Sequence, residues 1–306
     1  MKIIDGHCHL ASTRYIPQQF FEDVAANITC KMIAYGEKVS YSKILQMLLM
    51  QHNDHYGDRL IVEMDAASIS RTVLLIPDFS SAMAMPLPQR EIYEAHFQVT
   101  QKYPGRFYVF PGVNPLRGQV ALDEFVESIE NFGFHGLKLY PPCGYSPSNK
   151  CLYPFYDFCQ EKSLPVLLHT GPTVQSLNLT LMPPSLICAA ARDFPGVNFI
   201  LAHGAVAYVE EAVELARNWP NLYIDTGGIS GAIFPGKWQK QLLSVLLADI
   251  ENKVIFGSDW PVTRMSGGLK NLVTGITSNP AITQQITPTA LQVFFGENIT
   301  RLIEGG

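Results

Sequence analysis

The run Ile3-Ile4-Asp5-Gly6-His7-Cys8-His9-Leu10 opens the sequence as a short apolar segment that ends in two histidines. Alternate side chains of a β-strand point to the same face, so His7 and His9 are expected to lie side by side. Two imidazoles in this arrangement can bind one metal ion. Three later apolar runs also end in polar residues, at His169, His203 and Asp259, and a turn follows each.

Eight β-like runs alternate with segments of helical periodicity along the chain. Most runs are rich in Val, Ile, Leu, Phe and Tyr without strict polar alternation, as is typical of parallel strands buried on both faces. The sequence therefore predicts an α/β protein with a (β/α)8 TIM-barrel fold, and a doubly wound open sheet is the competing architecture. The expected strands are Lys2–His7, Thr72–Pro77, Phe107–Val113, Gly136–Tyr140, Pro165–His169, Val197–His203, Leu222–Asp225 and Lys253–Ser258. The expected helices are Gly57–Ser68, Pro88–Tyr103, Val120–Phe132, Pro154–Lys162, Pro184–Phe194, Val209–Ala216 and Trp238–Ile250.

Residues 11–55 form a long insertion between the first strand and its helix. This insertion carries its own helical pattern around Ser42–Gln51. An insertion of this length in a compact domain is either a lid over a binding site or a packing element on the barrel rim, and both alternatives stay open. We expect a single domain over residues 1–306.

The composition excludes several classes of function. Of the 306 residues, 47% are hydrophobic and 16% charged, and the net charge is −5. There is no basic block, so nucleic-acid binding is not expected, and no apolar run reaches the length of about 18 residues that spans a membrane. The chain starts directly with a strand and has no Cys-x-x-Cys pair, so we expect a cytoplasmic protein with reduced, packed thiols. The oligomeric state is open, with a homodimer among the alternatives.

The polar residues that carry chemistry fall near the carboxyl ends of the expected strands, where barrel enzymes assemble their active sites. Burying these residues without partners would cost several kcal/mol for any unpaired charge, and a bound divalent cation removes that cost. Neutral imidazoles with a carboxylate suit zinc, the metal we expect, and also manganese, iron or cobalt. The minimal ligand set is His7, His9, His169 and Asp259, with His203 close by.

Four further residues are candidates for binding a substrate anion by their position: Lys138, Tyr140, Arg14 and Arg264. Three roles stay open for Lys138. It contacts a substrate carboxylate, or it forms a carbamate that bridges two metal ions, or it pairs structurally with Asp5 or Asp225. One metal ion is expected, and two if Lys138 is carbamylated.

Taken together, these motifs resemble the amidohydrolase superfamily, in particular the amidohydrolase 2 branch of predicted metal-dependent hydrolases and aminocarboxymuconate-semialdehyde-type decarboxylases. The resemblance rests on Asp5–Leu10, Gly136–Pro141, His169–Gly171, Ala202–Gly204, Phe256–Pro261 and the tail Gly296–Ile303. It implies metal ligands at His7, His9, His169 and Asp259, and His203 as the catalytic histidine.

The segment Lys138–Pro141 is similar to hydrolases of the superfamily in which that lysine is carbamylated. We therefore predict a metal-dependent hydrolase that uses a metal-activated water to cleave a C–O or C–N bond of a small, carboxylate-bearing substrate. Asp259 would shuttle the proton, and His203 would polarise the carbonyl or fix the water. The alternatives are a non-oxidative decarboxylase of an aromatic or unsaturated acid and a non-catalytic barrel with a structural metal. A TatD-type nuclease is disfavoured because such nucleases carry a glutamate where this chain has Gly133–Lys138.

Overall fold

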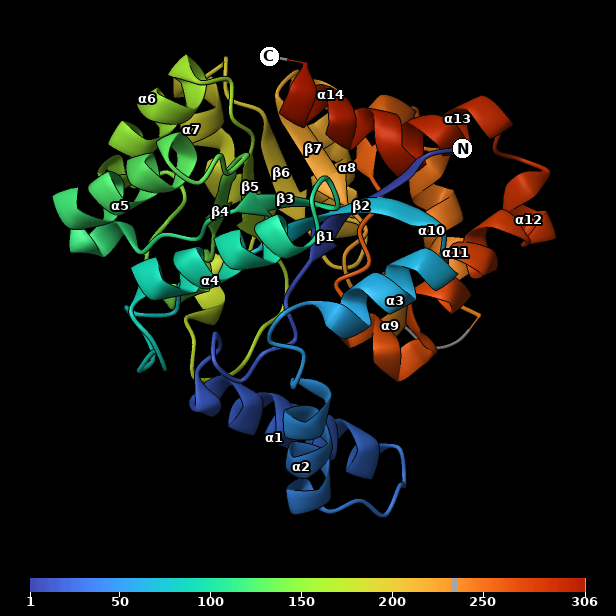
Figure 1. The fold of residues 1–306 in the computed structure, drawn as a ribbon. Helices are drawn as coiled ribbons and strands as arrows, with labels where there is room; N and C mark the ends of the chain where they lie inside the picture. Colours follow the sequence, from blue (N-terminus) through green and yellow to red (C-terminus); the bar gives the residue numbers. More distant parts are fainter. Residues whose placement is uncertain (233–235, 306) are drawn as a thin grey trace.

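The computed structural model describes residues 1–232 and 236–305, and these residues form eight parallel strands with helices around them (Figure 1). Strands β1, β2 and β3 pair in chain order, and β4 to β8 pair in chain order in a second set. The strands are β1 (Ile3–Cys8), β2 (Ile69–Leu75), β3 (Phe107–Phe110), β4 (Leu137–Leu139), β5 (Val166–His169), β6 (Phe199–Ala202), β7 (Leu222–Asp225) and β8 (Val254–Ile255).

Backbone hydrogen bonds join the two sets of strands at both seams. Between β3 and β4, the amide of Lys138 donates to the carbonyl of Pro111 at 2.9 Å. Between β1 and the segment after β8, the amide of Asp259 donates to the carbonyl of His7 at 2.7 Å, and the amide of Gly6 donates to Phe256 at 2.8 Å. The fold is the (β/α)8 TIM barrel that the sequence predicted.

Helices alternate with the strands and cover their outer faces (Figure 1). The predicted helices are present within a few residues of their expected bounds, except that 184–194 divides into a 3-10 turn at Pro184–Ile187 and a short α-helix. Pro184 lies at the first position of the 3-10 turn, where the N–H that proline lacks would have no partner within the turn. The helices are α1 (Gln18–Ala34), α2 (Tyr41–Gln51), α3 (Asp58–Ala66), α4 (Gln89–Lys102), α5 (Gln119–Glu130), α6 (Tyr153–Glu161), α7 (Cys188–Asp193), α8 (Val209–Asn218), α9 (Ile229–Ala232), α10 (Trp238–Leu246), α11 (Gly268–Thr277), α12 (Pro280–Thr283), α13 (Pro288–Gln292) and α14 (Asn298–Glu304).

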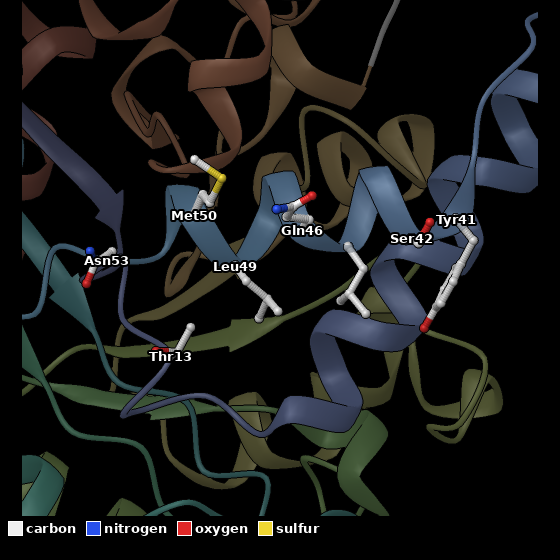
Figure 2. Close-up of a pocket in the computed structure, with 8 residues that line it drawn as sticks. Thr13, Tyr41, Ser42, Gln46, Leu49, Met50 and Asn53 are labelled. Carbon is white, nitrogen blue, oxygen red and sulfur yellow. The ribbon is translucent and has the colours of Figure 1, made fainter.

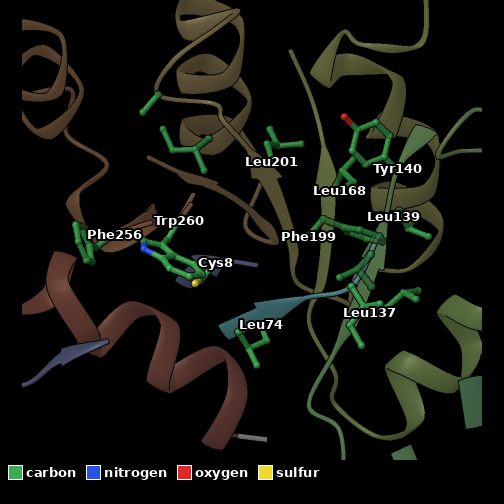
Figure 3. Close-up of a cluster of buried hydrophobic side chains, with 14 of the residues drawn as sticks. Cys8, Leu74, Leu137, Leu139, Tyr140, Leu168, Phe199, Leu201, Phe256 and Trp260 are labelled. Atoms are coloured by element: carbon green, nitrogen blue, oxygen red, sulfur yellow. The ribbon is translucent and has the colours of Figure 1, made fainter. Parts of the chain in front are cut away.

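Side chains alternate between two apolar clusters, one inside the barrel and one between the strands and the helices. Leu137, Leu139 and Leu168 belong to the outer cluster (Figure 3). Leu167, which pairs with Lys138 across β4 and β5, belongs to the inner cluster. Because successive side chains of a strand point to opposite faces, Lys138 faces the barrel interior.

The insertion folds into a helical hairpin, α1 and α2, which lies beyond the carboxyl ends of the strands (Figure 1). The sequence predicted only the second helix of this pair. The sequence of α1 does not show a single apolar face, because apolar residues occur on both sides of the helix. Phe21 and Ala25 are buried, whereas Ile33 is 57% exposed. The ring of Phe20 packs on Phe79, which follows β2, with centroids 4.9 Å apart, and this contact anchors α1 to the barrel rim.

The C-terminal tail seals the opposite end of the barrel between β8 and β1. A π-helical turn at Val293–Glu297 brings Gly296 so close to β1 that an added Cβ would lie 2.7 Å from the Lys2 carbonyl oxygen. The Asn298 amide nitrogen donates to the carbonyls of Glu251 and Val254 at 2.8 and 2.7 Å. The tail therefore fixes where β8 begins.

None of the helices within residues 1–232 and 236–305 has the length and hydrophobicity needed to cross a bilayer. All six cysteines are free thiols, and Cys8, Cys143 and Cys159 are buried.

Candidate metal centre and catalytic site

The two histidines of the first strand meet Asp259 at the mouth of the barrel. Nε2 of His7 lies 3.6 Å from Oδ1 of Asp259, and Nε2 of His9 lies 3.5 Å from the same oxygen. These separations exceed an ordinary hydrogen bond. They match the distance of about 3.4 Å between two ligand atoms that each lie ~2.1 Å from one tetrahedral ion. The three side chains therefore form a group that can hold one cation.

Hydrogen bonds behind the imidazoles orient them toward this point. Nδ1 of His7 is 2.8 Å from Oδ2 of Asp225, and Nδ1 of His9 is 2.8 Å from the carbonyl oxygen of Leu75. An acceptor at Nδ1 places the ring proton there and leaves the lone pair on Nε2, as metal-binding histidines require.

His169 and His203 complete the cluster of rings. The ring centroid of His203 lies 4.7 Å from that of His7 and 4.8 Å from that of His169. Tyr140 stacks on His169 with ring centroids 4.2 Å apart. The structure thus brings the four predicted ligands and His203 together, although His169 lies outside the tighter group of His7, His9 and Asp259.

The residues present fit a divalent cation. Nε2 of His7 and Nε2 of His169 are buried, and neither has a hydrogen-bond partner among the residues that the structure describes. Burial and the nearby charges of His203, Lys138 and His7 lower the pKa of His169 well below its usual value, so its ring is neutral. Burial would raise the pKa of Asp259, but hydrogen bonding to His9 and the charges of His7 and His203 hold it below its ordinary range. Neutral imidazoles and an ionised carboxylate are the donor set of such an ion.

Two residues of the cluster have left-handed backbone conformations that non-glycine residues rarely adopt. The φ angle is +62° at His203 and +56° at Asp259. Such conformations cost of order 1–3 kcal/mol and concentrate at functional sites. His203 directly follows β6, and Asp259 lies four residues after the end of β8, so both belong to the rim of the barrel.

Lys138 is buried in the barrel interior without a charged partner. Its side chain forms no hydrogen bond or ion pair within residues 1–232 and 236–305, and burial lowers its pKa from 10.5 to about 8. The two carboxylates proposed as structural partners are engaged elsewhere. Asp5 accepts the amide and hydroxyl of Ser258 at 2.9 and 2.5 Å, and Asp225 faces His7. The pairing alternative for Lys138 therefore finds no support in the contacts.

The other predicted substrate-binding residues have partners within the protein. Arg264 pairs with Glu63 at 3.0 Å, and the Arg14 guanidinium donates to the hydroxyl of the exposed Tyr56 at 3.3 Å. The hydroxyl of Tyr140 is 2.7 Å from Oγ1 of Thr173. Among these three, Tyr140 is the one that contacts a predicted ligand, and the roles of all three stay predictions.

Sequence reasoning placed Asp225 at a strand end and considered it only as a structural partner of Lys138, not as a partner of the histidines, and it missed Gly227 altogether. An added Cβ at Gly227 would lie 2.6 Å from Nδ1 of His7, so a glycine is needed for the ring to fit. The carbonyl of Gly227 also accepts a hydrogen bond from Nδ1 of His203 at 2.8 Å. The signal available in the sequence was the pair Gly227-Gly228, separated by one residue from the end of the seventh strand.

A separate apolar groove of about 470 Å³ runs along α2 (Figure 2). The segments before and after the hairpin contribute Thr13 and Asn53 to it. The other lining residues are Tyr41, Ser42, Leu45, Gln46, Leu49 and Met50. None of the residues predicted to bind metal or substrate lines this groove.

A family model described as "Amidohydrolase" matches residues 4–304. Among curated proteins, Protein fluG of Emericella nidulans is 35% identical over 69 residues, which are 22% of this chain and 8% of that protein.

Similar solved structures share the fold over almost the whole chain. An uncharacterised TIM-barrel protein from Bordetella bronchiseptica has a TM-score of 0.70 and 20% identity, with 99% of this chain and 98% of that chain covered. A 2,6-dihydroxybenzoate decarboxylase in complex with 2,6-dihydroxybenzoate has a TM-score of 0.67 and 16% identity, with 98% and 99% covered. A dihydroxybenzoic acid decarboxylase from Polaromonas sp. JS666, with bound manganese and an inhibitor, has a TM-score of 0.64 and 16% identity, with 98% and 97% covered.

Proposed function

The chain belongs to the amidohydrolase family, and from this premise we propose that it is a metal-dependent hydrolase that cleaves a C–O or C–N bond of a small, carboxylate-bearing substrate. The observation that carries the proposal is the group of His7, His9 and Asp259, in which the buried Nε2 of His7 lies 3.6 Å from Oδ1 of Asp259 and has no hydrogen-bond partner among the described residues. A buried lone pair beside an ionised carboxylate favours a cation that binds both.

The ligands would be His7, His9, His169 and Asp259. When bound there, a divalent cation would act as a Lewis acid on a substrate carbonyl and would lower the pKa of water. Zinc and manganese both suit this donor set. The bound manganese of the Polaromonas decarboxylase supports a divalent ion of this kind.

Two residues would move or hold protons. Because Nδ1 of His203 faces the carbonyl of Gly227 at 2.8 Å, its ring proton lies on Nδ1 and its Nε2 is a free acceptor. Burial, followed by the charge of His7, lowers the pKa of His203, so the ring is neutral near pH 7 and can hold a water through Nε2. Asp259 is ionised, and this carboxylate would accept a proton from that water and deliver it to the leaving group.

Lys138 would bind the substrate carboxylate. It is the buried cation of the barrel interior, and the charges of Asp225 and Asp259 at the mouth act on it. Loss of carbon dioxide moves the carboxylate charge onto the carbon skeleton, so a cation that holds the carboxylate stabilises the ground state more than the transition state. In hydrolysis elsewhere in the substrate the carboxylate keeps its charge, and binding by Lys138 is compatible with the reaction.

Decarboxylation of an aromatic or unsaturated acid is the second candidate, because four of the similar solved structures are decarboxylases. A single panel separates the candidates. The metal-free protein, reconstituted with zinc or with manganese, is given lactones, amides and aromatic carboxylic acids, and acid release and carbon dioxide are followed in parallel. Acid release from a lactone or amide that requires the metal supports the hydrolase. Carbon dioxide release supports the second candidate, and equal turnover by the metal-free protein contradicts both.

A pair of histidine substitutions tests the residue assignment. His203→Gln is expected to lower kcat by ~100-fold or more, on the scale of ~10²–10³-fold for loss of one group that stabilises the reacting oxygen, while the metal content stays unchanged. His135→Gln makes the same change at the other end of the barrel, where His135 packs on Tyr108, and should leave kcat unchanged. Equal kcat values for the two variants would remove His203 from the mechanism.

A further inference from the structure

Asp225 joins three groups of the site through one carboxylate. It ends β7 and is fully buried. Its Oδ2 accepts a hydrogen bond from Nδ1 of His7 at 2.8 Å. Its Oδ1 accepts the backbone amides of His203 at 2.8 Å and of Gly227 at 2.9 Å. Three donors therefore converge on two oxygens of the same side chain.

The contact with His7 decides which ring nitrogen can bind a metal. A carboxylate accepts hydrogen bonds and does not donate them, so Nδ1 of His7 must carry the ring proton. The lone pair then lies on Nε2, which is buried without a partner among the described residues and faces Asp259. A proton on Nε2 instead would point at the centre of the predicted ligand set and exclude the ion.

The contacts with the two backbone amides hold the neighbouring histidine. Residue His203 is in the left-handed conformation, and its amide is tied to Oδ1 of Asp225. The same oxygen binds the amide of Gly227, whose carbonyl accepts from Nδ1 of His203. One carboxylate oxygen thus fixes both the backbone of His203 and the group that orients its ring.

We infer that Asp225 is a positioning residue that keeps the ring proton of His7 on Nδ1 and anchors His203 beside the metal centre. This inference rests on the proposed metal site, but it concerns ring protonation and metal affinity and not the reaction catalysed. It assigns the seventh strand a part in building the site, although Asp225 itself is not a predicted ligand.

The substitution Asp225→Asn separates the two contacts of the carboxylate. An asparagine has one accepting oxygen and one donating NH2 group. The backbone amides of His203 and Gly227 cannot give up their protons, so the oxygen should face them and the NH2 group should face His7. The imidazole of His7 can respond by moving its proton to Nε2, which removes its lone pair from the site.

Zinc affinity and ring tautomers are the two measurements. In the metal-free variant, zinc should bind at least 10-fold more weakly in a chelator competition, within the range of ~10- to 100-fold that loss of such partners causes. In metal-free protein with ¹⁵N-labelled histidine, NMR should assign the ring proton of His7 to Nδ1 in the wild type and to Nε2 in the variant. His203 should stay protonated on Nδ1 in both proteins.

Asp78→Asn is the matched control, because Asp78 is also a buried carboxylate after a barrel strand and accepts the amide of Ser80 at 2.9 Å, with no imidazole partner among the residues that the structure describes. Its zinc affinity should stay within twofold of the wild type. A proton on Nε2 of His7 in the wild type would overturn the inference whatever the variants do. So would unchanged zinc affinity in the Asp225→Asn protein, or weakened affinity with an unchanged His7 tautomer. A failure to find hydrolysis would leave all of these results valid.

Discussion

Replacing Lys138 by methionine is expected to stabilise the metal-free protein and to abolish binding of the substrate carboxylate. Methionine fills similar space without a charge, and the Lys138 ammonium has no hydrogen bond or ion pair among the described residues to lose. Burial lowers its pKa from 10.5 to about 8. Each tenfold shift of an acid constant corresponds to ~1.4 kcal/mol, so the buried charge costs about 3 kcal/mol of stability at pH 7.

The stability of the wild type should increase with pH, which sets the direction of the expected change. Between pH 8 and 10.5 the unfolded chain keeps the lysine proton while the folded chain has lost it. Stability rises with pH wherever the unfolded state binds more protons, so the wild type should gain stability across this window. The advantage of Lys138→Met should therefore fall from about 3 kcal/mol at pH 7 to under ~1 kcal/mol at pH 10.

Urea unfolding of the metal-free wild type and of Lys138→Met at pH 7 and pH 10 measures the free energy of unfolding of each protein at both pH values. Lys162→Met, at a partly exposed lysine near Glu130 and Glu161, is the control and should change stability little. A Lys138→Met protein that is less stable at pH 7, with full activity, would refute the reasoning. If the wild type gains the mass of one carbon dioxide in bicarbonate and loses it in degassed buffer, the lysine is a carbamate and the argument from an unpaired ammonium fails.

Two further predictions concern groups outside the predicted ligand set. His96 is buried, and burial lowers its pKa from 6.5 to about 4, so its contribution to stability is complete above pH 6.5 and is lost as pH falls toward 4. His96→Leu should flatten the acid side of the urea-unfolding profile by up to ~1.4 kcal/mol per pH unit, and an unchanged slope between pH 6.5 and 4 would contradict this. Asn298→Ala leaves the carbonyls of Glu251 and Val254 without their donor and should cost about 2 kcal/mol in thermal unfolding. Asn218→Ala, which removes an exposed bond to the Glu214 carbonyl, should cost almost nothing, and equal losses in the two variants would refute the sealing role of Asn298.

The ring of strands and the residues at its mouth were predictable because both depend on local pattern. Apolar runs give the strands, and parallel strands place their carboxyl ends at one rim, so His169, His203 and Asp259 meet without any knowledge of their contacts. Pairs across the ring were not predictable in this way. The bond between His7 and Asp225 joins residues 218 positions apart, and periodicity says nothing about which side chains face each other there. The ion pair between Arg264 and Glu63 could not be predicted from the sequence for the same reason.

The distribution of unsatisfied buried groups supports a cation site at the mouth of the barrel. An unpaired buried polar atom costs about 1–3 kcal/mol, so a stable protein keeps few of them. Within residues 1–232 and 236–305 there are five such side-chain atoms, and two of them are the Nε2 atoms of His7 and His169. The left-handed residues His203 and Asp259 add backbone strain at the same rim. A ligand that binds the folded state alone offsets these costs by mass action, so the metal-loaded protein should unfold at a higher temperature than the metal-free protein, and by more as free metal increases.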